Sequence, residues 1–244
     1  MIDFGELILE TSAHPEHAGK ELSWMTPDTK SNFSVNLRFD KKRKLLERNG
    51  WVDTPIKYKF NKYGFRCNEF DCVPNIVFLG CSYTLGMGVN LEDTFSAIVA
   101  KELGLENYNL AQAGGSNDSA FRISNYWIPL LEPKIVVIMN PNDDRIEIVQ
   151  KNSTTFNIIP RYHQEQKKFY KLWLSNHTNG ILNKSKNTKA IQQLCYENNV
   201  KDFYRFDAMD IEFVRKDVGR DIDHFGVKTH QGIAENILTT IRGT

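Results

Sequence analysis

The sequence has few cysteines and almost no net charge. Its 244 residues include four cysteines and no C-x-x-C pair. This argues against a disulfide scaffold or a zinc finger and favours free thiols in a reducing compartment. Thirty-one Lys and Arg residues face 30 Asp and Glu residues, a net charge of +1. The chain therefore lacks the basic excess that is typical of a nucleic-acid-binding domain.

Long apolar runs are also missing. No segment approaches the roughly 20 apolar residues that span a bilayer. The opening residues MIDFGELILETSAH combine early acidic residues with a very short apolar patch, unlike a secretory signal. We therefore expect a cytoplasmic protein that binds neither nucleic acid nor membrane. The hydrophobic fraction of 41% is nevertheless sufficient for a folded core.

Beyond residue 75, short apolar runs alternate with segments of helical periodicity. The expected strands cover residues 76–79, 108–111, 134–139 and 202–206, and the expected helices cover 92–103, 118–131, 188–199 and 228–242. This alternation predicts a three-layer α/β/α fold with a parallel, flavodoxin-like central sheet. We assign this domain to residues 76–244, with an irregular insertion at about 146–186. Residues 1–75 form an N-terminal extension of mixed structure.

Chemically distinctive residues follow the expected strands, at the edge where open parallel sheets bind ligands. They are Ser82, Gly114 and Asn142 after successive strands, and Asp221 and His224 before the last helix. A hydroxyl, a base, a carboxylate and oxyanion donors are what acyl transfer requires. Each residue alone has a structural explanation, such as a helix cap or a turn, so their joint occurrence is what favours catalysis. The glycines after the first strand form neither a P-loop nor a dinucleotide fingerprint.

These segments resemble, in order, the four signature blocks of the SGNH (GDSL-type) hydrolase superfamily. The matching residues are Gly80-Cys81-Ser82, Gly114, Asn142, and Asp221 with His224 in a D-x-x-H segment. The upstream segment Asn61 to Arg66 also resembles an Asn-x-x-Gly-Phe-Arg element that precedes the nucleophile in some members. Two residues depart from the family pattern: Cys81 replaces an Asp, and Asn140 replaces a Gly.

The resemblance implies a serine ester hydrolase that works through an acyl-enzyme. Ser82 is then the nucleophile, His224 its base, and Asp221 the carboxylate that orients His224. The backbone N–H groups of Ser82 and Gly114 and the side chain of Asn142 form the oxyanion hole. No metal or organic cofactor is needed. The substrate is expected to be a small-molecule or glycan ester, such as an O-acetyl group on a carbohydrate.

Several alternatives stay open at this point. Cys81 is a rival nucleophile, Asp223 competes with Asp221, and His230 competes with His224, although we favour the first assignment in each case. Aromatic residues of the insertion could stack on a sugar or form the core of a small subdomain; they are Tyr162, Phe169, Tyr170 and Trp173. The same triad would also serve an acyltransferase acting on a glycan. A non-catalytic binding or structural module is the third possibility.

Overall fold

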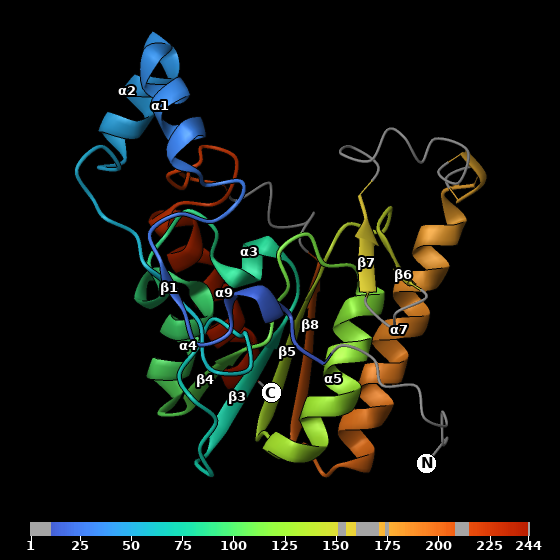
Figure 1. The fold of residues 1–244 in the computed structure, drawn as a ribbon. Coiled ribbons are helices and arrows are strands. Elements are labelled where there is room, and N and C mark those ends of the chain that lie inside the picture. The colour runs from blue at the N-terminus through green and yellow to red at the C-terminus, as the bar shows by residue number, and fades with distance from the viewer. Residues whose placement is uncertain (1–10, 151–154, 160–170, 174–175, 208–214, 244) are drawn as a thin grey trace.

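A parallel sheet of four strands lies at the centre of the computed structural model, which describes residues 11–150, 155–159, 171–173, 176–207 and 215–243 (Figure 1). The sheet has the order β4-β3-β5-β8. Its strands are β3 (Asn75–Leu79), β4 (Glu106–Asn109), β5 (Ile135–Asn140) and β8 (Asp202–Asp207). Every residue of β3 and β5 is buried, as expected for parallel strands that are covered on both faces.

Helices cover both faces of this sheet. On one face α4 (Phe95–Leu103) packs against α9 (Val227–Arg242), and on the other α5 (Asn117–Leu131) packs against α7 (Thr178–Glu197) (Figure 1). Alternate residues of β3 contribute to the two resulting apolar clusters, Phe78 to the α4/α9 side and Val77 to the α5/α7 side. The predicted three-layer α/β/α fold with a parallel, flavodoxin-like sheet is confirmed.

Local capping explains where the helices begin. Thr94 caps α4, its side chain accepting a hydrogen bond from the Ala97 N–H. The helix expected from residue 92 therefore starts at Phe95, and a 3-10 turn, η2 (Leu91–Asp93), precedes it. Ser116 and Ser119 form a reciprocal capping box at the start of α5, which satisfies two backbone donors.

The irregular insertion expected at 146–186 contains regular structure. Strand β6 (Ile146–Val149) pairs antiparallel with β7 (Thr155–Ile158), and α7 begins at Thr178 rather than at residue 188. The early turns of α7 show no apolar periodicity in the sequence, because the buried positions there include Asn183 and Asn187. Both side chains donate hydrogen bonds to the Asp118 carboxylate. Three of the aromatic residues singled out above, Tyr162, Phe169 and Tyr170, lie outside the described residues.

The extension contributes two short strands and a helical hairpin. Strand β1 (Glu21–Leu22) pairs antiparallel with β2 (Tyr58–Lys59). The helical elements are η1 (Pro15–His17), α1 (Lys30–Arg38) and α2 (Asp40–Arg48). In Figure 1, α1 and α2 stand beyond the carboxyl ends of the sheet strands. The domain division at residue 75 stays a prediction. None of the described helices is both long and apolar enough to cross a membrane.

Candidate active site

Ser82 opens the short helix α3 (Ser82–Leu85), directly after β3. Gly80 makes this tight connection possible, because a Cβ there would collide with Thr84 and lie 2.8 Å from the Met139 carbonyl oxygen. Gly86 ends α3 in the left-handed conformation, with φ of 79°, and its N–H donates to the Ser82 carbonyl. The sharp turns on both sides fix Ser82 at the carboxyl edge of the sheet.

His224 and Asp221 lie on the loop before α9 and meet Ser82 across 142 sequence positions. The Nε2 atom of His224 is 2.8 Å from the Ser82 Oγ, and its Nδ1 atom is 2.5 Å from Asp221 Oδ2. The backbone N–H of His224 donates to Asp221 Oδ1 at 3.1 Å. Asp221 is buried and the His224 side chain is 13% exposed. A hydroxyl, an imidazole and a carboxylate therefore form one continuous hydrogen-bonded chain, the arrangement that activates a serine.

The competing residues occupy different surroundings. Asp223 is exposed on the same loop. His230 is fully buried inside α9, where its Nδ1 accepts a hydrogen bond from the Phe95 N–H and burial lowers its pKa to about 3. Cys81 is also fully buried. The structure thus brings Ser82, His224 and Asp221 together, while their catalytic roles stay predictions.

The loops that carry the predicted oxyanion donors leave the same sheet edge as Ser82, since β3, β4 and β5 are parallel. Gly114 has φ of 70°. A Cβ at this position would come within 3.0 Å of the Ile159 Cδ1 atom. Asn142 is half-buried, and its backbone carbonyl accepts a hydrogen bond from the Arg145 N–H. Their contribution to an oxyanion hole stays a prediction.

Arg66, the last residue of the upstream Asn61–Arg66 segment, is fully buried and contacts the end of α3, the helix that Ser82 opens. Its guanidinium donates to the carbonyl oxygens of Leu85, Gly86 and Val89 at 2.6–3.0 Å. Burial lowers the Arg66 pKa to about 10, so the group stays charged near neutral pH. Arg66 therefore fixes the loop that follows Ser82, which gives a physical reason for an arginine at this position.

Asp28 of the extension holds both loops of the site through buried partners. Its Oδ2 atom lies 2.7 Å from Nη2 of Arg220, the neighbour of Asp221. The same oxygen accepts a hydrogen bond from the Tyr58 hydroxyl at 2.6 Å. Tyr58 Oη in turn accepts the Gly88 N–H from the loop beyond α3, and the Gly88 carbonyl accepts the Arg220 N–H. We call Asp28, Tyr58 and Arg220 the anchor network. The sequence offers no signal for it, because its members lie far apart along the chain.

The roles of two further residues, His14 and Asp217, are not predicted from the sequence. The Nε2 atom of His14 accepts the Ala113 N–H at 3.2 Å, directly beside Gly114. The Asp217 carboxylate accepts the N–H groups of Lys228 and Thr229 and so caps the start of α9. Capping residues are normally sought immediately before a helix, and Asp217 lies ten positions from the first residue of α9. Both contacts hold loops that carry predicted site residues.

Asn140, where the family pattern has a glycine, contacts other parts of the structure through its side chain. Its amide donates to Asp207 on β8 at 3.0 Å, and its carbonyl oxygen accepts the Thr188 hydroxyl of α7 at 3.2 Å. The residue therefore links a strand and a helix on the α7 side of the sheet. These two hydrogen bonds give a structural role to an asparagine at the position where the family pattern has a glycine.

Comparison with known proteins gives likenesses in structure alone. No family model matches the chain, and no curated protein is similar to it in sequence. The esterase EstA from a Pseudoalteromonas species is 15% identical, with 69% of this chain and 97% of that chain covered and a TM-score of 0.39. A lipase/acylhydrolase from Enterococcus faecalis is 15% identical, with coverage of 70% and 96% and a TM-score of 0.38.

A family two carbohydrate esterase from Clostridium thermocellum, solved in complex with cellohexaose, is also similar. It is 15% identical, with 70% of this chain and 64% of that chain covered and a TM-score of 0.38. At such identities and TM-scores these likenesses assign no activity to the chain by themselves.

Proposed function

We propose that this protein is a serine ester hydrolase of the SGNH type. The observation that carries the proposal is the hydrogen-bonded chain from Ser82 through His224 to Asp221, with distances of 2.8 and 2.5 Å. The order of the four sequence segments supports the same family. The preferred substrate is a small acyl ester, such as an acetyl group on a carbohydrate or a similar alcohol.

The geometry supports an acyl-enzyme route. The Ser82 hydroxyl attacks the ester carbonyl carbon while His224 Nε2 takes its proton, and Asp221 stabilises the imidazolium that forms. The oxygen that gains negative charge is held by the N–H groups of Ser82 and Gly114 and by the Asn142 amide. His224 then protonates the leaving alcohol. A water molecule activated by the same histidine cleaves the acyl-serine and releases the acid.

Intact mass after treatment with a fluorophosphonate tests this proposal without knowledge of the natural substrate. We expect one adduct on the wild-type protein and none on Ser82→Ala. Ser23→Ala, which removes an exposed hydroxyl, is the matched control and should label like the wild type. Labelling of both Ser82→Ala and wild type would point to another nucleophile. No adduct on any of the three proteins would overturn the proposal and favour a non-catalytic module.

A further inference from the structure

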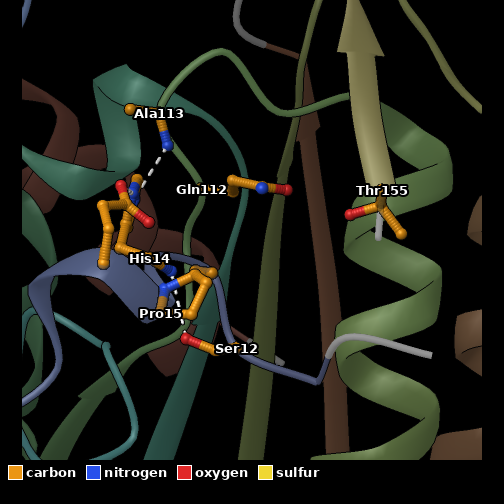
Figure 2. A pocket seen from close by; sticks show the side chains of 8 residues that line it. Ser12, His14, Pro15, Gln112, Ala113 and Thr155 are labelled. Carbon is orange, nitrogen blue, oxygen red and sulfur yellow. Dashed lines mark hydrogen bonds and ion pairs between the residues drawn. The ribbon is translucent and has the colours of Figure 1, made fainter. Parts of the chain in front are cut away.

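A cavity of about 250 Å³ lies between the extension and the loop that carries Gly114 (Figure 2). Its lining residues are Ser12, Ala13, His14, Pro15, Glu16, Gln112, Ala113 and Thr155. The cavity opens to solvent on one side. It is large enough for a single small ring with its substituents.

The cavity shares a wall with the proposed oxyanion loop. Gln112 and Ala113 immediately precede Gly114, and consecutive Cα atoms are about 3.8 Å apart. The opposite wall comes from β7, whose Thr155 lines the cavity and whose neighbour Ile159 flanks Gly114. Figure 2 shows the Gln112 side chain extending toward Thr155 across this space. The cavity therefore adjoins the loop that carries Gly114, one of the proposed oxyanion donors.

The lining offers hydrogen-bonding groups and one fixed negative charge. Ser12, Gln112 and Thr155 supply hydroxyl and amide groups, and the lining residues that the structure describes include no lysine or arginine. His14 accepts the Ala113 N–H at Nε2, so its proton is on Nδ1, 3.7 Å from the Glu16 carboxylate. Burial lowers the pKa of His14, whereas the contact with His14 lowers the pKa of Glu16 to about 2. Near neutral pH the Glu16 carboxylate is ionised. Its side chain is 60% exposed, His17 Nε2 lies 3.4 Å from Glu16 Oε1, and the Lys20 ammonium donates to the Glu16 backbone carbonyl.

From this geometry we propose that the cavity binds the alcohol portion of the ester, an uncharged group bearing several hydroxyls, and that Glu16 excludes anionic alcohols. The proposal rests on the esterase function proposed above. Hydroxyl groups can donate to the Glu16 carboxylate and to the Ser12 and Thr155 hydroxyl oxygens. The Gln112 Oε1 atom already accepts from Asn157 and Arg122. A carboxylate or phosphate on the alcohol would instead meet a like charge, and like-charge contacts are a common means of rejecting the wrong ligand.

The first experiment measures selectivity. Hydrolysis of an acetylated neutral sugar and of the matching acetylated uronic acid is followed for the wild type and for Glu16→Gln. We expect the wild type to prefer the neutral ester and Glu16→Gln to reduce that preference about fivefold or more, the effect of removing one unit charge about 4 Å away in water. Glu47→Gln, an exposed change on α2, is the matched control and should leave the preference unchanged.

The second experiment measures binding in the absence of turnover. Saturation-transfer NMR on Ser82→Ala detects the free neutral sugar, and adding Thr155→Phe fills the cavity. We expect binding to Ser82→Ala and its loss in the double variant. Equal binding to both, or an unchanged preference in Glu16→Gln, would overturn the cavity assignment. Fluorophosphonate labelling of Glu16→Gln and Thr155→Phe separates the two proposals, because that probe reports Ser82 alone.

Discussion

Within the sheet domain the buried strands β3 and β5 are almost wholly apolar, whereas the extension brings buried charges to the same interior. The sheet domain supplies every proposed catalytic side chain. The extension supplies Asp28 and Arg66, which hold the backbone on either side of that chemistry. Apolar contacts join the two regions as well, since Phe65 and Cys67 belong to the cluster beneath α5 and α7.

In this chain the sheet domain carries the proposed catalytic side chains, and the extension holds the loops on which those side chains lie. The free energy gained by burying apolar side chains depends mainly on the area removed from water and little on how the side chains are oriented. Hydrogen bonds to buried arginine and aspartate side chains have defined distances and angles, and a broken one leaves an unpaired buried charge. The extension therefore fixes the two loops more narrowly than packing alone would.

The largest expected effect comes from Asp28→Ala, which breaks the anchor network. Arg220 and the Tyr58 hydroxyl lose their shared partner inside the protein. Removing one member of a buried ion pair destabilises proteins by about 3–5 kcal/mol, and we expect a loss of this size in urea unfolding, with slower fluorophosphonate labelling. Asp40→Ala is the control: it breaks two exposed ion pairs on α2 and should leave urea unfolding almost unchanged, because exposed ion pairs contribute little to stability. Equal losses for both variants would contradict the comparison.

Asn142→Ala is expected to affect activity without a comparable effect on stability. Loss of one oxyanion donor typically lowers kcat by about 10²–10³-fold. The side chain is half-buried and belongs to the sheet domain, so urea unfolding should change little. Asn142→Asp, which removes the donor while keeping the shape, should show a similar loss in kcat. Full activity in both variants would remove Asn142 from the proposed site.

The smallest effect is a pH dependence, and both regions contribute to it. Burial lowers the pKa of His230 in the sheet domain to about 3 and also lowers that of His14 in the extension. In the unfolded chain both histidines bind a proton as the pH falls through about 6.5. In the folded protein they stay neutral until the pH nears their lowered pKa values. The stability that is present above pH 6.5 is therefore lost as the pH falls below about 6.5.

For His230 this predicts a measurable difference between wild type and His230→Gln. The stability of the wild type relative to the variant should fall by about 1 kcal/mol between pH 7.0 and pH 5.5. Urea unfolding at the two pH values measures it. His14→Gln is the matched variant in the extension and should show a change of the same sign. A difference that is constant with pH would show that the pKa of His230 is not lowered in the folded protein.

Much of the sheet domain could be predicted from sequence. The apolar runs of β3 and β5 and the glycine that ends α4 are local signals, and so is the position of Ser82 after a strand. The spacing of Asp221 and His224 is local as well, which is why their pairing could be anticipated. Strand β6 and the early turns of α7 were missed because their inward-facing residues include Glu147 and Asn183, which are buried through polar partners.

The contacts made by the extension were beyond such reasoning. His14 and Ala113 lie 99 positions apart, and no local pattern pairs them. The Arg66 position could be matched to a family element, but its role depends on three carbonyl groups of a loop 19 to 23 positions away. Contacts between residues so far apart depend on the whole fold and produce no periodic pattern in the sequence.

The pairing of Asp28 with Arg220 has a consequence for how the protein is made. The two residues are 192 positions apart, and a ribosome delivers the N-terminal one first. Until the region around residue 220 has left the exit tunnel, Asp28 lacks the guanidinium that neutralises it, and the Asp221–His224 loop does not yet exist. Contacts between such distant positions also form slowly. A nascent chain can therefore form the β3, β4 and β5 part of its sheet early, while Ser82 meets its proposed base His224 only after residues 221–224 have been made.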